Sequence, residues 1–223
     1  MSHSPFLPGV IFDIDGVLLD SNPAHFESWR AMAEEDGFDF TPQLFQETFG
    51  QRSDAILANH WNRPLSEAEI IEMVRRKEDL YRESAKKKFP EMPGASAFVR
   101  TLAERGFPLS VGSSGPGINV DFVIERLGIL PLLKGVISGS DVSRGKPAPD
   151  IFLACAQKMG LPPERCCVID DSASGVRAAL DAGMKIVGFF SGGHKPDEYR
   201  GVDLLIHSFG ELSAERITAL FEF

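Results

Sequence analysis

The chain has 223 residues, of which 43% are hydrophobic and 25% are charged, and its formal net charge is -9. These values are typical of a globular protein with a sizeable core, and the acidic balance argues against nucleic acid or an anionic membrane as the main partner. No apolar run reaches membrane-spanning length and the first residues lack a signal-peptide pattern, so we expect a cytoplasmic protein. An anionic substrate stays open, because a bound divalent cation can invert the local field.

The cysteines do not follow the spacing of a disulfide framework; they are Cys155, Cys166 and Cys167. Cys166 and Cys167 are adjacent within an apolar run, which indicates small buried hydrophobic side chains. We therefore expect neither disulfides nor a redox role.

The first predicted element is a buried strand within residues 8–14, and Gly16 indicates a turn directly after it. Residues 23–89 then show helical patterns and no strand-like run. Three aromatic residues of this stretch are expected in its core: Trp29, Phe49 and Trp61. The insert is therefore expected to be all-helical.

The last helix of this stretch is expected to begin with a capping box formed by Ser66 and Glu69. Its charged residues indicate a solvated face that includes Lys77. Two exposed ion pairs are expected from the spacing: Glu72 with Arg76, and Glu78 with Arg82.

Beyond Pro93 short apolar runs alternate with helical patterns. Strands are expected at residues 109–112, 135–138, 166–169, 185–189 and 203–206. This alternation predicts parallel βαβ units and a doubly wound sheet. The predicted fold is an α/β, Rossmann-like core of residues 1–20 and 91–223, interrupted by a helical domain of residues 21–90.

Polar residues follow the ends of four predicted strands, where open parallel sheets bind ligands. They are Asp13, Asp15 and Gly16; Ser113 and Ser114; Lys146; and Asp170 and Asp171. Carboxylates without histidine or cysteine companions suit a hard cation such as Mg²⁺. One carboxylate can act as a nucleophile and a second as acid and base, while a lysine and hydroxyl groups bind phosphoryl oxygens. Asp171 could alternatively cap the helix expected near Gly175.

These residues resemble the four motifs of the haloacid dehalogenase superfamily, in the order of that family and across the whole chain. The motifs are Asp13-x-Asp15-Gly16-Val17, Ser113, Gly145-Lys146-Pro147 and Asp170-Asp171-Ser172. The resemblance implies Asp13 as nucleophile and Asp15 as acid and base. It implies Ser113 and Lys146 as phosphate binders. It also implies Mg²⁺ held by Asp13, the main-chain carbonyl of Asp15, and Asp171, with Asp170 assisting.

The helical insert resembles the cap of the β-phosphoglucomutase and phosphoglycolate-phosphatase-like branch. This implies substrate contacts by His25, Arg52 and Lys77, besides Gly16 and Ser114 in the core. The chain has Asn22 where the branch often carries an acidic residue. Residues 192–195 resemble a loop of sugar-phosphate phosphatases.

Asp15 argues against a dehalogenase, whose pattern lacks the second aspartate. The stretch between Asp20 and Trp61 lacks the lysine that a phosphonatase of this family needs near its first cap helix. A regulatory module without catalysis would be expected to lose Asp13 or Lys146, and both are present. We predict a Mg²⁺-dependent phosphatase acting on a small phosphorylated metabolite, with a sugar-phosphate mutase as the main alternative. The sequence leaves the substrate and the oligomeric state open.

Overall fold

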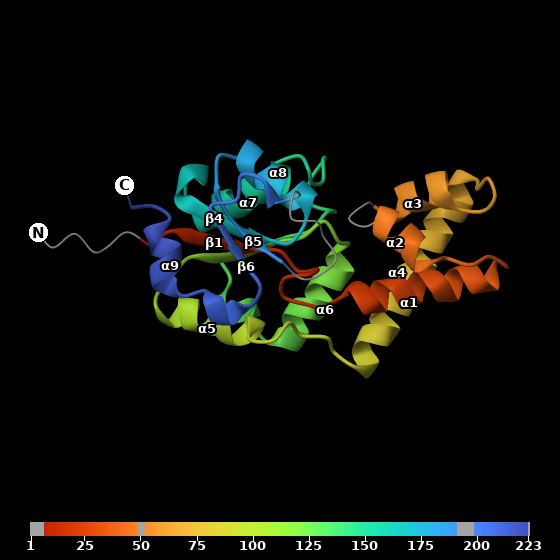
Figure 1. Ribbon diagram of the computed structural model, residues 1–223, viewed down its shortest axis with the longest axis horizontal. Helices are drawn as coiled ribbons and strands as arrows, with labels where there is room; N and C mark the ends of the chain where they lie inside the picture. Colours follow the sequence, from red (N-terminus) through yellow and green to blue (C-terminus); the bar gives the residue numbers. More distant parts are fainter. Residues whose placement is uncertain (1–6, 49–51, 191–198, 223) are drawn as a thin grey trace, which may run out of the picture. The chain divides into compact units, whose positions relative to one another are not determined.

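The computed structural model describes residues 7–48, 52–190 and 199–222 (Figure 1). The chain divides into two compact units. The core unit comprises residues 1–20 and 91–223, and the helical unit comprises residues 21–90. Each unit has its own hydrophobic cluster and is described separately below.

The core unit contains a six-stranded parallel sheet with the strand order β3-β2-β1-β4-β5-β6. The strands are β1 (Gly9–Phe12), β2 (Leu109–Gly112), β3 (Gly135–Ile137), β4 (Cys166–Asp170), β5 (Lys185–Phe189) and β6 (Leu204–Ile206). Phe12 of β1 lies opposite Val111 of β2 and Ile169 of β4. Because this register aligns the strand ends, the residues that follow them reach the same edge of the sheet.

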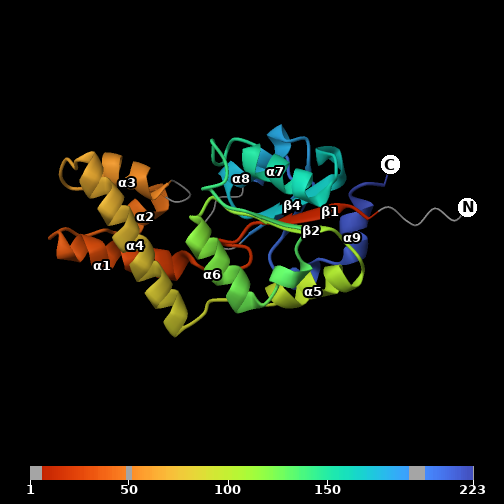
Figure 2. The same cartoon turned by 180° about the vertical axis from the view of Figure 1, so that it is seen from behind.

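Helices cover both faces of this sheet. They are α5 (Ala95–Glu104), α6 (Gly117–Leu127), α7 (Asp150–Met159), α8 (Ala173–Asp181) and α9 (Ala214–Ala219). Within the described residues, short 3₁₀ helices span Leu130–Leu132, Pro163–Arg165 and Phe209–Glu211. Figures 1 and 2 show α7 and α8 on one face of the sheet and α5 and α6 on the other. This doubly wound arrangement confirms the predicted fold class.

The residues of β1 are all buried, as expected for a central strand with helices on both faces. Ile11 of β1 and Val168 of β4 pack with Phe152 of α7 in one cluster. The three cysteines are also buried and unpaired, as predicted. Burial raises the pKa of the Cys155 and Cys166 thiols to about 12, so they remain protonated at neutral pH.

The helical unit contains α1 (Asn22–Glu35), α2 (Pro42–Thr48), α3 (Ser53–His60) and α4 (Glu67–Lys87). Its core holds Trp29, Phe40 and Trp61, and the rings of Trp29 and Phe40 stack at 5.4 Å. The predicted core positions of both tryptophans are confirmed, whereas Phe49 lies outside the described residues. No helix in the described ranges combines the length and the apolar character needed to cross a bilayer.

The capping box of α4 is confirmed, because Ser66 and Glu69 each accept a hydrogen bond from the other's main chain. The predicted pair of Glu72 with Arg76 is wrong, and Glu78 is buried where an exposed pair with Arg82 was predicted. A contact between Glu78 and Arg82 stays a prediction. The pairs observed are Glu72 with Arg75, Arg76 with Glu35 of α1, and Arg82 with Asp79. Side chains three residues apart are neighbours on a helix as readily as those four apart, and packing of α1 beside α4 offers Arg76 another partner.

Candidate active site

Lys146 joins two aspartates that follow or end neighbouring strands. Asp13 comes directly after β1, and its main-chain N–H donates to the carbonyl of Ile169 at 3.0 Å. The Lys146 Nζ lies 2.9 Å from Asp13 Oδ1 and 2.8 Å from Asp170 Oδ2. Its side chain is only 4% exposed. Asp13 and Asp170 are 157 positions apart in the sequence. The structure brings them together, as their places at the ends of predicted strands indicated.

Three buried carboxylates form a group that fits a metal ion. Asp13, Asp170 and Asp171 each offer one ligand oxygen, and these oxygens lie within 4.8 Å of one another. With all three carboxylates ionised beside one ammonium, two negative charges would be unbalanced, which a divalent cation would offset. Oxygen ligands of this kind are those that Mg²⁺ prefers. The donor set and its charge therefore fit the predicted cation.

Burial and neighbouring charges act on the pKa values of this group in opposite directions. Burial raises the pKa of Asp13 well above its ordinary value; the charge of Lys146 lowers it, and the neighbouring aspartates raise it further. Burial alone would lower the pKa of Lys146, but the charges of Asp13 and Asp170 outweigh it and raise that pKa. The lysine thus stays charged, and the surplus of carboxylates around Asp13 favours a bound proton or a bound cation there.

Asp170 is held by several donors. Its Oδ1 accepts hydrogen bonds from the N–H and the hydroxyl of Ser172 at 2.9 and 2.8 Å, while Oδ2 accepts from Lys146. A Cβ on Gly175 would lie 2.0 Å from this carboxylate, so only glycine fits there. The cap of α8 is Ser172, whose hydroxyl accepts from the Gly175 N–H. The alternative in which Asp171 caps this helix is therefore wrong.

Gly16 makes room for Asp171. Its φ of +74° favours glycine, and a Cβ built there would lie 1.7 Å from Asp171 Oδ2. The sequence indicated Gly16 as a point where the main chain approaches an anion. In the structure the anion beside Gly16 is this carboxylate.

Ser113 and Asp15 border the same small space. Ser113 is 2% exposed, and its hydroxyl accepts from the Gly115 N–H at 3.0 Å. A Cβ on Gly115 would lie 3.3 Å from Ser113 Oγ and 4.0 Å from Asp15 Oδ2. Ser114, the other candidate in this turn, is exposed. The first two motifs thus meet at the carboxyl ends of β1 and β2.

Two of the predicted substrate residues, the half-buried His25 and the buried Lys77, form a pair in the helical unit. Lys77 is 3% exposed, and its Nζ lies 2.9 Å from His25 Nδ1 and 3.0 Å from Glu78 Oε1. The ring of Tyr81 stacks on His25 at 4.0 Å. The interpretation of Lys77 as part of a solvated face is therefore wrong.

Glu78 is a buried residue that the sequence reasoning placed on the surface. It is 6% exposed, and its Oε1 also accepts a hydrogen bond from the Ser53 hydroxyl at 3.0 Å. A signal for its burial existed, because Val74 and Tyr81 lie four residues before and three residues after Glu78 on α4. Because charged residues occur all along α4, the sequence did not reveal the buried face that contains Glu78.

Arg52 does not join the His25–Lys77 pair through any hydrogen bond or ion pair among the described residues. Its side chain is 69% exposed and pairs with Asp54 at 3.0 Å. The hydrogen bonds that Arg52 donates to the Asp54 carboxylate raise the pKa of Arg52. The loop at 192–195 that resembles sugar-phosphate phosphatases lies outside the described ranges, as does Gly50 before Arg52.

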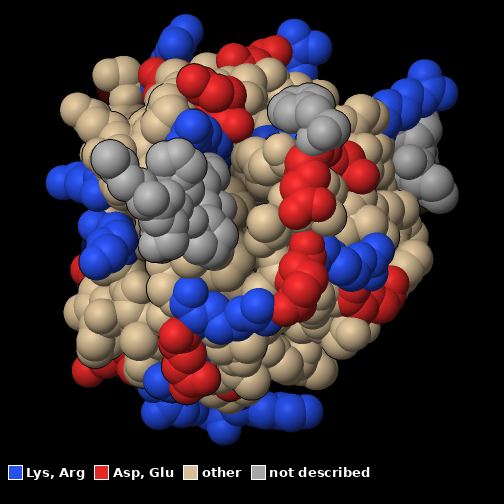
Figure 3. Space-filling view, turned by 90° about the vertical axis from the view of Figure 1, so that its left-hand side faces the viewer, with Lys and Arg blue, Asp and Glu red and all other residues tan. Residues whose placement is uncertain are grey.

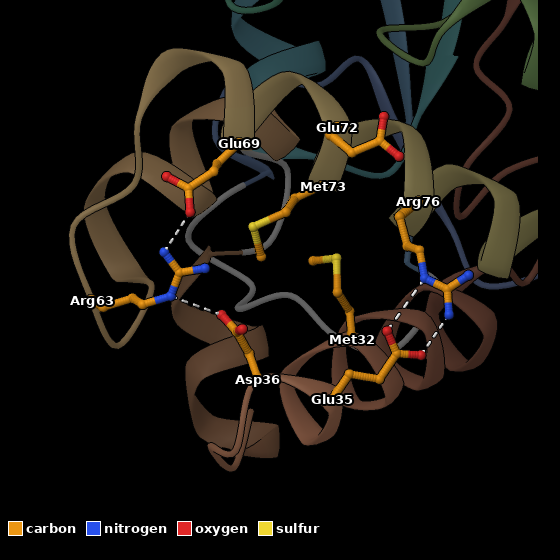
Figure 4. A pocket seen from close by; sticks show the side chains of 8 residues that line it. All are labelled: Met32, Glu35, Asp36, Arg63, Glu69, Glu72, Met73 and Arg76. Carbon is orange, nitrogen blue, oxygen red and sulfur yellow. Dashed lines mark hydrogen bonds and ion pairs between the residues drawn. The ribbon is translucent and has the colours of Figure 1, made fainter.

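The helical unit also contains a pocket of about 380 Å³, whose lining side chains Figure 4 shows. It is lined by Met32, Glu35, Asp36, Arg63, Glu69, Glu72, Met73 and Arg76. Both of its arginines are already paired, Arg63 with Asp36 and Glu69 and Arg76 with Glu35. None of the predicted site residues lines it, so it is separate from the His25–Lys77 pair.

Surface charge is mixed on the face of the molecule in Figure 3, where basic and acidic side chains alternate. A protein that follows a nucleic-acid backbone usually gathers its basic residues into a stripe or patch. The visible face has no such patch among its described residues.

Comparisons with known proteins place these features in a family. A model described as haloacid dehalogenase-like hydrolase matches residues 7–183. Hexitol phosphatase A of Escherichia coli is 29% identical over 208 residues, which cover 93% of this chain and 94% of that protein. Beta-phosphoglucomutase of Bacillus subtilis is 28% identical over 216 residues, covering 94% and 93% respectively.

A solved structure gives the same result. The crystal structure of a HAD hydrolase of family IA, variant 3, from Entamoeba histolytica has a TM-score of 0.88 and 27% identity. The match covers 96% of this chain and 99% of that one. Since the family model spans most of the chain and the fold agrees, the chain is an enzyme of the haloacid dehalogenase-like hydrolase family.

Proposed function

We propose that the chain is a Mg²⁺-dependent phosphatase that hydrolyses a small phosphorylated metabolite, such as a sugar phosphate or a phosphoglycolate-like acid. The main support is that the Lys146 ammonium lies between Asp13 and Asp170 within a buried acidic group. A relative that covers nearly the whole chain, hexitol phosphatase A, supports this reaction class.

The proposed reaction has two displacements at phosphorus. A carboxylate oxygen of Asp13 attacks phosphorus, the bond to the leaving oxygen breaks, and Asp15 gives that oxygen a proton. Asp15 then takes a proton from water, whose oxygen attacks phosphorus and breaks its bond to Asp13. Lys146 and Ser113 hold the phosphoryl oxygens during both steps.

Asp13, Asp171 and the main-chain carbonyl of Asp15 are the proposed Mg²⁺ ligands. When bound, Mg²⁺ supplies positive charge that offsets the repulsion between Asp13 and the phosphoryl group. Asp170 contributes indirectly, because Ser172 and Lys146 already occupy its carboxylate oxygens. This supports an assisting role for Asp170.

Residues 21–90 are proposed to act as the cap that selects the substrate. His25, Arg52 and Lys77 are its proposed substrate residues, joined by Gly16 and Ser114 of the core. The His25–Lys77 pair is partly buried and places two nitrogen atoms 2.9 Å apart, which suits a hydroxylated or anionic substrate group.

A sugar-phosphate mutase is the second candidate, supported by the likeness to beta-phosphoglucomutase over 94% of this chain. In that case a second sugar hydroxyl, in place of water, takes the phosphoryl group from Asp13. A module without catalysis is not favoured, because Asp13 and Lys146 are both present and in contact.

A panel of phosphorylated sugars and small acids separates these functions. We expect phosphate release in the presence of Mg²⁺, and its loss in Asp13→Asn with the fold retained by circular dichroism. The matched control is Asp181→Asn on α8, whose carboxylate pairs with Arg177 at the surface. Isomer formation with a bisphosphate primer and without phosphate release would establish the mutase instead. Near-wild-type turnover of Asp13→Asn would falsify the mechanism.

A further inference from the structure

Tyr199 links the connection between β4 and α8 to the neighbouring strand β5. It is 4% exposed, and its hydroxyl donates to the Asp171 carbonyl at 2.7 Å. The Phe189 carbonyl at the end of β5 lies 3.2 Å from the same hydroxyl. Since a phenol has one hydrogen to donate, the shorter contact to Asp171 is the main one.

Gly188 makes room for the tyrosine ring. A Cβ on Gly188 would lie 2.7 Å from Cδ1 of Tyr199, closer than such atoms can approach without movement. Gly188 is also the β5 partner of Asp170 in the sheet register. The ring is therefore seated at the end of β5, beside the end of β4 where the acidic group begins.

Asp171 needs such support because it belongs to no regular element. β4 ends at Asp170 and α8 begins at Ala173, so the main chain of Asp171 lies in the connection between them. Its carboxylate fills the space over Gly16, and its carbonyl receives the Tyr199 hydroxyl. The side chain of Asp171 thus lies close over Gly16, while its main chain accepts a hydrogen bond.

We propose that Tyr199 is a positioning residue that orients Asp171 for divalent-cation binding. The proposal rests on the metal site proposed above and adds to it a residue outside the four motifs. Tyr199 does not touch the substrate or the ion; it acts through the main chain of a ligand. Partners of this outer kind commonly change metal affinity by about 10-fold to 100-fold when they are removed.

The test is Mg²⁺ binding to the full chain, measured by isothermal titration calorimetry without substrate. Tyr199→Phe keeps the ring but removes the hydroxyl, and we expect its Kd for Mg²⁺ to rise about tenfold. In assays the Mg²⁺ concentration for half-maximal activity should rise similarly, while kcat at saturating Mg²⁺ stays near that of the wild type. A merely structural role would not move the metal dependence alone.

The matched control is Ser110→Ala, which also removes a buried hydroxyl, one that donates to the Gly135 carbonyl at 2.8 Å. Its Kd for Mg²⁺ should match that of the wild type. A second variant, Gly188→Ala, should displace the ring and weaken Mg²⁺ binding too. Because both changes break one contact, the double variant should bind no more weakly than Gly188→Ala alone.

The outcomes are distinguishable. If Tyr199→Phe and Gly188→Ala both bind Mg²⁺ as the wild type does, or if Ser110→Ala weakens binding equally, the role of Tyr199 is wrong and the phosphatase proposal stands. If the wild type hydrolyses phosphomonoesters without binding Mg²⁺, the metal site fails and this proposal fails with it. Should Tyr199→Phe not fold, the Gly188→Ala measurement decides.

Discussion

Each unit buries a lysine, and the two lysines differ in the charge around them. The side chains of Lys146 and Lys77 are each 4% exposed. Lys146 contacts two carboxylates, with Asp171 close by, so negative charge exceeds positive charge. Lys77 contacts one carboxylate, Glu78, and the ring nitrogen of His25.

This difference leads us to expect different roles for the two lysines. A buried charge is costly unless it is paired, so the excess carboxylates of the core unit call for a further cation. The Lys77–Glu78 pair is balanced without one. We therefore expect changes in the core unit to affect turnover most, and changes in the helical unit to affect stability and substrate affinity.

Metal removal should have the largest effect and should act on the core unit alone. An excess of chelator is expected to abolish phosphate release, and added Mg²⁺ should restore it, because the excess negative charge around Asp13 then repels the phosphoryl group. Far-UV circular dichroism should change little. Full activity with excess chelator would contradict the metal site. It would also show that the surroundings of Lys146 need no further cation, as those of Lys77 do not.

Lys146→Met should lower kcat/KM by about 10³-fold, because it removes the charge that binds phosphoryl oxygens. Steady-state kinetics at saturating Mg²⁺ would measure this. Lys158→Met is the control, since Lys158 lies exposed in the last turn of α7. Equal losses in both variants would show that the buried position of Lys146 has no special role.

Glu78→Ala should chiefly affect stability. Removing one partner of a buried pair leaves Lys77 without its carboxylate, which we expect to lower the free energy of unfolding by about 3 kcal/mol. Urea denaturation measures this, and Glu72→Ala, which removes an exposed pair with Arg75, should cost about 0.5 kcal/mol or less. The KM for sugar phosphates should rise more than kcat falls; the reverse pattern would place Lys77 nearer the chemistry.

The smallest expected effect lies at the start of α4 and depends on pH. The main-chain hydrogen bond from Ser66, its hydroxyl and Arg63 lower the pKa of Glu69 from 4.5 to about 2. A lowered folded-state pKa stabilises the protein above the unfolded value, and this contribution is lost as pH falls from 4.5 through about 2.

Glu69→Gln should therefore melt about 2 °C below the wild type at neutral pH, with a difference that shrinks on acidification. Thermal melts over this pH range measure it. Glu67→Gln in the same first turn is the control, since it shares the helix end but not the capping box. A difference that grows at low pH would mean that the charge of Glu69 does not stabilise the folded helix.

Local patterns predicted much of the core unit. Short apolar runs such as residues 9–12 are typical of strands buried on both faces, and their alternation with helical patterns indicates a parallel sheet covered by helices. Because parallel strand ends meet at one edge, the contact of Asp13 with Lys146 was predictable. The capping box of α4 was predictable too, since it involves residues only three apart.

By itself, then, the sequence determined the elements, their parallel arrangement and the residue types at the strand ends. Only the tertiary structure decided that Lys77 and Glu78 are buried, that Arg76 pairs with Glu35, and that Tyr199 supports Asp171. The physical reason is distance along the chain. A hydrogen bond within one turn depends on local spacing, whereas a partner 28 residues away, as Tyr199 is from Asp171, depends on which surfaces pack together.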